Sequence, residues 1–205
     1  MAQAPSERIE VLIRHTGELA RAGMTPATSS NFSVRLNDDQ CLITVSGRDK
    51  GRLTAEDFMA VDGHGNALEA GRKSSAETLL HTQIYRLRPQ ANAVLHTHSL
   101  AQTLLSMHYA EQGRIIFTGY ELQKAFQGVN SHEGSIELPI VANAQDMSVL
   151  CASTEPLFAK TAFWGYLITG HGLYAWGRDI DEARRHLDAF EFLLTAELAK
   201  LGMRA

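Results

Sequence analysis

The segment Ala93–Ser99 is an apolar run that ends in two histidines separated by one residue. On a β-strand successive side chains point to opposite faces, so His96 and His98 share a face and offer two imidazoles to one ion. Much further along the chain, His171 lies between two glycines at the junction of two strand-like runs, where it is placed to supply a third ligand. Three histidines with an open fourth position are typical of a catalytic zinc site, although Co²⁺, Mn²⁺ and Fe²⁺ also accept imidazole ligands. If all three bind one ion, two distant strand ends must meet in the fold.

The rest of the chain alternates between two periodicities. Apolar residues spaced three and four apart predict helices, and short apolar or alternating runs bounded by turn residues predict strands. Helices that alternate with strands, together with two hairpins, indicate one α/β domain over residues 1–205 with a mixed central sheet. The expected helices cover 6–22 with Ser6 as N-cap, 75–88, 100–107, 146–160 and 180–201, with a short helical turn near 123. The expected strands cover 31–36, 41–45, 59–61, 93–99, 114–117, 136–141, 166–169 and 173–176.

Composition excludes several classes of protein. With 44% apolar residues among 205, the chain can bury a core of its own. A formal net charge of −4 and scattered Lys and Arg residues give no basic surface for nucleic acid. No apolar stretch suits a membrane span and the first ten residues lack a signal-peptide pattern, so we expect a cytoplasmic protein. Cys41 and Cys151 lie in apolar segments far apart in the sequence, which favours reduced thiols.

Three loops of small and polar residues suit an anion. The loop 28–31 precedes the first expected strand, and the loop 46–51 follows the second, so hydroxyls, backbone N–H groups and cations converge at one sheet edge. The loop 73–75 leads into a helix, whose N-terminal N–H groups attract anions. Each loop also has a simpler interpretation as a turn or cap. The spacing of Ser74 and Glu77 likewise matches a capping box, and spacing alone favours that role for Glu77.

The order of these motifs resembles that of the class II aldolase/adducin family over nearly the whole chain. Within the family, the motifs are most similar to those of members that dehydrate a phosphorylated ketose in methionine salvage. The features that carry this closer similarity are the run 76–81, the His-Thr-His-Ser form of the metal pair, and the segment 119–126. The motifs that carry the family resemblance are Ser30-Asn31-Phe32-Ser33, Val45-Ser46-Gly47, the segment 53–57, Ser74-Ser75-Ala76-Glu77, His96-Thr97-His98 and Gly170-His171-Gly172.

The resemblance implies a three-layer α/β/α domain with a mixed central sheet. It also implies a cyclic homotetramer whose active sites lie near subunit interfaces, with one Zn²⁺ per subunit and a phosphorylated ketose as substrate. By the same resemblance the zinc ligands are His96, His98 and His171. The residues placed around the substrate phosphate are Asn31, Ser46, Gly47 and Ser75. The family often has Ser-Ser-Glu where this chain has Ser74-Ser75-Ala76-Glu77, which puts the matching role of Ser74 in doubt.

Two carboxylates are candidate acid/base residues by resemblance. Glu77 matches the acid/base group of many aldolases of the family, and Glu121 matches the general acid/base of its dehydratases. We expect the pKa of Glu121 to be raised by a desolvated position beside Leu122 and Phe126. The main alternative reaction is retro-aldol cleavage of a sugar phosphate such as fuculose 1-phosphate, because fold alone does not separate the two. A non-catalytic scaffold or a metal-storage protein fits less well, because all three ligand histidines and the phosphate-type loops are present.

Overall fold

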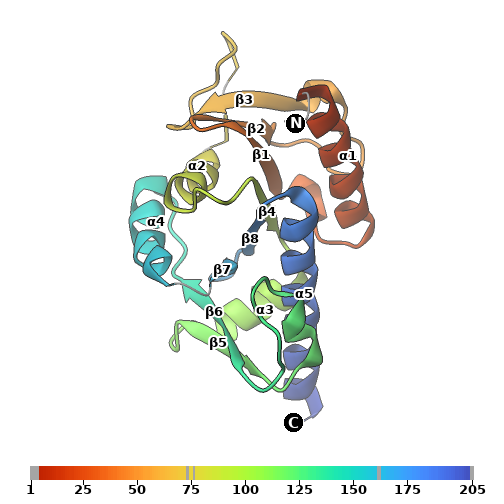
Figure 1. Cartoon of the computed structure of the whole chain (residues 1–205), viewed down its shortest axis with the longest axis vertical. Helices are drawn as coiled ribbons and strands as arrows, with labels where there is room; N and C mark the ends of the chain where they lie inside the picture. The colour runs from red at the N-terminus through yellow and green to blue at the C-terminus, as the bar shows by residue number, and fades with distance from the viewer. Residues whose placement is uncertain (1–4, 73, 76, 161–162, 204–205) are drawn as a thin grey trace.

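One mixed sheet of eight strands runs through the described part of the chain (Figure 1). The computed structural model describes residues 5–72, 74–75, 77–160 and 163–203. Lys73 and Ala76, which belong to motifs named above, lie outside the described residues. Strands β6 and β7 are parallel, and every other neighbouring pair is antiparallel. In sheet order the strands are β3 (Phe58–Asp62), β2 (Gln40–Thr44), β1 (Asn31–Asn37), β4 (Ala93–Thr97), β8 (Leu173–Gly177), β7 (Gly165–Ile168), β6 (Ser135–Val141) and β5 (Arg114–Thr118).

Helices cover both faces of this sheet, as Figure 1 shows. One face carries α1 (Pro5–Arg21), α3 (Leu100–His108) and α5 (Ile180–Met203), and the other carries α2 (Thr78–Leu87) and α4 (Met147–Thr154). The prediction of an α/β fold with a mixed central sheet is therefore confirmed. Four short 3₁₀-helices complete the described elements: η1 (Pro26–Thr28), η2 (Ala55–Asp57), η3 (Glu121–Ala125) and η4 (Glu155–Ala159).

The buried apolar side chains form two clusters, one on each face of the sheet. Strand β4 contributes to both, because its side chains alternate. Ala93 and Leu95 belong to the cluster under α5, whereas Val94 belongs to the cluster under α2. His96 is two residues after Val94 and therefore faces the side of α2. The pleat thus directs the first metal-ligand candidate into a fully buried environment.

Several boundaries differ from the sequence prediction. Strand β4 ends at Thr97, so His98 lies just beyond the strand expected over 93–99. Helix α2 begins at Thr78 rather than at residue 75, and Ser6 lies inside the first turn of α1 instead of capping it. The helical stretch expected over 146–160 divides into α4 and η4. Pro156 explains this division, because proline has no N–H to donate and its ring crowds the carbonyl one turn earlier in a continuous α-helix. Among the described helices, none has both the length and the apolar character needed to cross a bilayer.

Candidate active site

Three histidines converge where β4 ends and the β7–β8 turn begins. The candidate ligand atoms of His96, His98 and His171 all lie within 4.8 Å of one another. The antiparallel pairing of β4 with β8 explains this proximity, since it sets Thr97 opposite Leu173 and so places the turn before β8 beside the end of β4. The sequence predicted this convergence, and the structure makes the three imidazoles a possible metal site.

The orientation of His96 can be derived from its contacts. Its Nδ1 lies 3.0 Å from the carbonyl oxygen of Leu173, so Nδ1 carries the proton and donates it. Its Nε2 therefore presents a lone pair, 2.9 Å from Nε2 of His98. Two nitrogens on one tetrahedral zinc lie about 3.3 Å apart for bonds of about 2.05 Å, so the spacing fits such an ion. The ring of Tyr174 stacks on His96 with centroids 4.0 Å apart and holds this orientation.

Burial also keeps two of these imidazoles, those of His96 and His98, in the protonation state that a metal requires. Burial, together with the neighbouring His171, lowers the pKa of His98 to about 4. Burial lowers the pKa of His96 well below its usual value. Both rings are therefore neutral near pH 7, with lone pairs available for a cation. His171 has a buried Nδ1 without a hydrogen-bond partner in the described part of the chain.

Glu77 adds a carboxylate beside the histidines. Its Oε1 lies 3.2 Å from Nε2 of His171, and its Oε2 lies 3.9 Å from Nε2 of His96 and accepts a hydrogen bond from Asn31. Burial alone raises the pKa of Glu77, but the contact with His171, the nearby His96 and the hydrogen bond from Asn31 together outweigh it and leave the pKa below its usual value. The capping-box prediction is wrong, because Ser74 Oγ donates to the carbonyl of Gly65 and the Glu77 side chain faces the histidines.

A small polar cavity adjoins the histidines. Its volume is about 180 Å³. Its lining joins the three loops singled out in the sequence to the metal-ligand candidates, and it includes all four residues predicted to surround a phosphate. Their role in binding phosphate remains a prediction, but the fold brings them together. The lining residues are Thr28, Ser29, Ser30, Asn31, Ser46, Gly47, Ser75, Glu77 and His98.

The backbone of this cavity is strained at two non-glycine residues. Thr28 and Ser30 have φ of 62° and 75°, in the left-handed region that costs an ordinary residue about 1–3 kcal/mol. Lys50 stabilises the loop from behind, because its fully buried ammonium donates to the carbonyl oxygens of Thr28 at 3.1 Å and Arg48 at 2.8 Å. The Ser29 hydroxyl is buried and has no hydrogen-bond partner among the described residues. Strain, an unpaired donor and a buried cation together are typical of an anion site.

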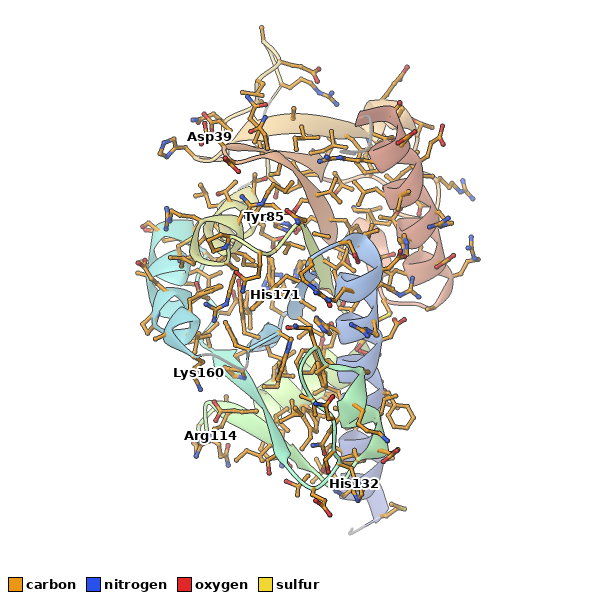
Figure 2. The ribbon with its side chains drawn as sticks, viewed as in Figure 1. Asp39, Tyr85, Arg114, His132, Lys160 and His171 are labelled. Carbon is orange, nitrogen blue, oxygen red and sulfur yellow. The ribbon has the colours of Figure 1, made fainter. Side chains whose placement is uncertain are left out.

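Glu121 lies apart from the histidines of its own chain. It begins η3, its side chain is 70% exposed, and it forms ion pairs with Lys124 and with His132 at 3.4 Å. Figure 2 shows His132 near the end of the molecule that holds the C-terminus, well away from His171. The hydrogen bond with Lys124 lowers the pKa of Glu121, so the expectation of a raised pKa is wrong for the single chain. The physical reason is that Leu122 and Phe126 do not shield the carboxylate from solvent.

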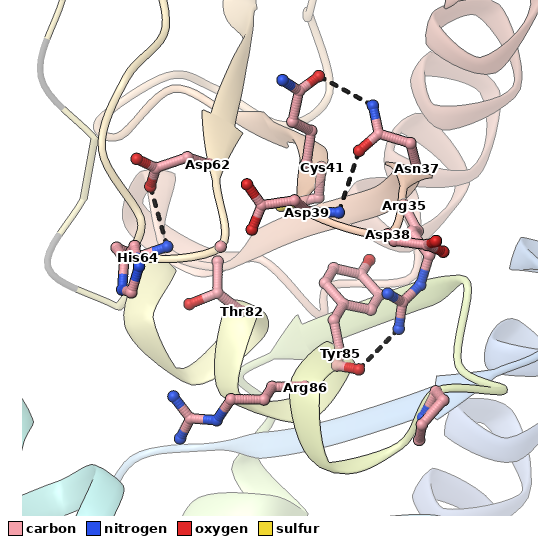
Figure 3. A pocket seen from close by; sticks show the side chains of 13 residues that line it. Arg35, Asn37, Asp38, Asp39, Cys41, Asp62, His64, Thr82, Tyr85 and Arg86 are labelled. Atoms are coloured by element: carbon pink, nitrogen blue, oxygen red, sulfur yellow. Dashed lines mark hydrogen bonds between the residues drawn. The ribbon is translucent and has the colours of Figure 1, made fainter.

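A second cavity lies between the β1–β2 hairpin and α2 (Figure 3). Its volume is about 380 Å³, and Arg35, Cys41, Thr82, Tyr85 and Arg86 contribute to its lining. None of the residues predicted for the active site lines this cavity, so its size alone does not make it the functional site. The residues predicted for the phosphate, together with Glu77 and His98, line the smaller cavity instead.

One polar contact of the active site was not anticipated from the sequence. His81 is fully buried, and its Nε2 contacts the side-chain oxygen of Asn31, whose amide holds Glu77. The sequence analysis gave His81 no role. The available signal was its spacing from Glu77, since residues four apart share one face of a helix.

The comparisons with known proteins agree with this fold. The family described as the class II aldolase and adducin N-terminal domain matches residues 10–198. The chain belongs to the class II aldolase/adducin family, as its motifs predicted. A methylthioribulose-1-phosphate dehydratase of Xanthomonas campestris pv. campestris (strain 8004) is 57% identical over 199 residues, with 97% of this chain and 92% of the relative covered. A protein of the same name from Stenotrophomonas maltophilia (strain R551-3) is 58% identical, with 97% and 93% covered.

Solved structures of the family share the fold. The L-fuculose-1-phosphate aldolase from Thermus thermophilus superposes with a TM-score of 0.76 at 28% identity, covering 97% of this chain and 98% of that one. YgbL from Klebsiella pneumoniae, described as a putative aldolase/epimerase/decarboxylase, superposes with a TM-score of 0.83 at 20% identity, covering 97% and 91%. The names of these two proteins differ from those of the dehydratases, so the fold alone does not select the reaction.

Proposed function

We propose that this chain is a zinc-dependent dehydratase that converts 5-methylthioribulose 1-phosphate to 2,3-diketo-5-methylthiopentyl 1-phosphate in methionine salvage. The observation that carries the proposal is the cluster of buried His96 with half-buried His98 and His171 beside Glu77, next to a cavity whose lining includes several serine and threonine residues. The two dehydratases that are 57% and 58% identical support the choice of substrate. We place the reaction in the cytoplasm and assign the whole chain to one domain.

The three imidazoles would hold one zinc ion per subunit. The neutral state of His96 and His98 and the 2.9 Å separation of their Nε2 atoms fit this role. A bound zinc ion would act as a Lewis acid and would polarise the C2 carbonyl and C3 hydroxyl of the substrate. The cavity residues Asn31, Ser46, Gly47 and Ser75 would bind the phosphate and so fix the position of C2 and C3. Lys50 adds a positive charge behind the same loop.

The reaction requires two proton transfers. A base removes the proton from C3, and the hydroxyl on C4 leaves as water after an acid protonates it; the resulting enol tautomerises to the diketone. Glu77 is the single carboxylate among the described residues that line the cavity, and it is placed to accept the C3 proton. Glu121 is our candidate for the group that donates to the C4 hydroxyl. It must then come from a second copy of the chain, because it lies apart from the histidines of its own copy.

Exposed apolar residues support such a contact between copies. Leu100, Leu104 and Met107 form a stripe on the outer face of α3, with exposures of 71%, 43% and 58%. This stripe lies beside the candidate active site, since Gly170 N–H donates to Ser106 Oγ of the same helix at 3.0 Å. A second apolar patch lies next to Glu121, in a groove that is lined in part by Leu122 and Phe192. Packing one patch onto the other joins different surfaces of two copies, which is the geometry of a closed ring. We propose the cyclic homotetramer implied by the family.

The test is an NMR assay of zinc-loaded protein with 5-methylthioribulose 1-phosphate, beside a sample stripped with a chelator. The proposal expects the 2,3-diketone to form without carbon–carbon cleavage, and expects its formation to stop on chelation and to resume when zinc is restored. A product unchanged by complete metal removal would reject the metal-dependent mechanism.

The structural similarity to L-fuculose-1-phosphate aldolase favours retro-aldol cleavage as the second candidate function. Cleavage between C3 and C4 needs the C4 hydroxyl deprotonated, whereas dehydration needs it protonated, so the two reactions place a proton oppositely at the same atom. The matching assay uses fuculose 1-phosphate and ribulose phosphate. An aldehyde together with a smaller phosphorylated fragment would select the aldolase.

A further inference from the structure

A line of hydrogen bonds leads from Glu77 away from the histidine cluster and into the core. Asn31 Nδ2 donates to Glu77 Oε2, and Asn31 Oδ1 contacts His81 Nε2. On the far side of the imidazole, His81 Nδ1 lies 2.7 Å from Ser33 Oγ, which lies 2.8 Å from the hydroxyl of Tyr85. Two residues of β1, two positions apart, thus meet Glu77 at the start of α2 and two residues of that helix at successive spacings of four.

The chemistry of the groups fixes the direction of every bond in this line. A carboxylate only accepts, so Asn31 must turn its NH₂ toward Glu77 and its carbonyl toward His81. That carbonyl also only accepts, so the proton of His81 must be on Nε2. The Nδ1 of the neutral ring is then an acceptor, which makes Ser33 the donor to it and Tyr85 the donor to Ser33.

We propose that His81 is a positioning residue that, through Asn31, holds the Glu77 carboxylate in its orientation toward His171. The role of Glu77 in the reaction rests on the function proposed above. Without the His81 N–H, the carbonyl oxygen of Asn31 loses its donor, and the amide is held only through its hydrogen bond to Glu77. The amide and the carboxylate can then move together, and the carboxylate no longer keeps its orientation toward His171.

The surroundings of His81 suit this task. Its side chain is fully buried, and its ring meets the edge of Tyr174 at a centroid distance of 5.5 Å, so it has little freedom to turn. Burial lowers the pKa of His81 to about 3, which keeps the ring neutral and in one tautomer near pH 7. A purely space-filling residue would not need a donor on one side of its ring and an acceptor on the other.

Three substitutions at this site separate positioning from filling space. The amide nitrogen of glutamine reaches roughly the place of Nε2, whereas that of asparagine reaches only about as far as Nδ1. His81→Gln therefore restores the donor to Asn31, whereas His81→Asn and His81→Leu do not. We expect kcat of His81→Gln to stay within about threefold of wild type, and kcat of the other two to fall about 10–100-fold, the usual effect of losing an outer partner of a metal site. Bound zinc per chain should remain unchanged in all three.

A spectroscopic measurement on the wild-type protein tests the same proposal without any variant. Long-range ¹H–¹⁵N correlation in zinc-loaded protein should show His81 protonated on Nε2 and unprotonated on Nδ1. The opposite tautomer, or wild-type kcat in a folded His81→Leu variant, would overturn the proposal. If wild-type protein fails to dehydrate 5-methylthioribulose 1-phosphate, the proposed function fails, and the tautomer of His81 still decides whether the line of hydrogen bonds is as described.

Discussion

Glu121 provides the sharpest test of how the active site is assembled. If Glu121 acts across a subunit interface, two inactive variants should restore each other when they share one oligomer. Glu121→Gln keeps the three histidines but lacks the acid, and His171→Ala lacks a metal ligand but keeps Glu121. Each variant alone should lose about 10²–10⁴-fold in kcat, the range for removing a general acid or its equivalent.

The expected recovery follows from the geometry of a ring with head-to-tail contacts. Each site combines the histidines of one copy with Glu121 of the next. When both variants are expressed together in equal amounts, intact histidines occur in half of the copies and intact Glu121 in half of their neighbours. About a quarter of the sites are then complete, so activity should rise to about 25% of wild type. If Glu121 acts within its own chain, no complete site exists in any mixture.

The assay uses two affinity tags, one on each variant, and purifies oligomers that carry both. Wild type co-expressed with Glu121→Gln is the matched control and should retain about half of the activity. Mixed oligomers that are isolated with both tags and remain as inactive as the single variants would refute the assembly of the site from two copies. A chain that stays monomeric at assay concentration would refute it as well.

Three further predictions follow from the local geometry. Gly172→Ala should lower zinc affinity at least about tenfold, because a Cβ there would lie 2.2 Å from the Thr97 carbonyl oxygen. The control is Gly134→Ala, whose Cβ would have nothing within 4 Å and which should bind zinc with unchanged affinity in the same titration. Because the pKa of His81 is about 3 when folded and 6.5 in its reference state, the unfolded state alone takes up this proton as pH falls below 6.5. Metal-free wild type should therefore lose about 2 kcal/mol more than His81→Gln between pH 7.5 and 5 in urea titrations, and equal losses would contradict a buried neutral ring. Ser46→Ala should raise KM about tenfold with kcat unchanged, because one hydrogen bond to a charged group is lost. A fall in kcat alone would argue against phosphate binding by Ser46.

The proximity of His96 and His98 could be predicted from the sequence, because that inference needs only the alternation of side chains along an extended chain. His96 and His98 are separated by one residue and precede the helix that begins at Leu100, so their proximity is a local property of the chain. The proximity of His171 depends instead on the register of β4 against β8, which no local pattern specifies. The resemblance to a family supplied that information.

Glu77 and Glu121 show two different limits of sequence analysis. Spacing favoured a cap for Glu77, but the helix begins only at Thr78 and the carboxylate has stronger partners in Asn31 and His171. Local propensity could not anticipate partners that come from other strands. For Glu121, the residues that are adjacent in sequence are apolar, but they do not cover its carboxylate. Their position along the chain therefore did not predict that the carboxylate is exposed to solvent.

The pleat of β4 has a consequence for altering this molecule. Because Ala93 and Leu95 face α5 whereas Val94 and His96 face α2, the central sheet acts as a partition between two cores. Repacking the α5 side changes contacts that are separated from the histidines by the thickness of the sheet, whereas repacking the α2 side changes the supports of Tyr174, His81 and Glu77. In a mutational library confined to the cluster under α5, the melting temperature should therefore vary widely among variants while turnover stays nearly constant. The same number of substitutions under α2 should alter stability and turnover together.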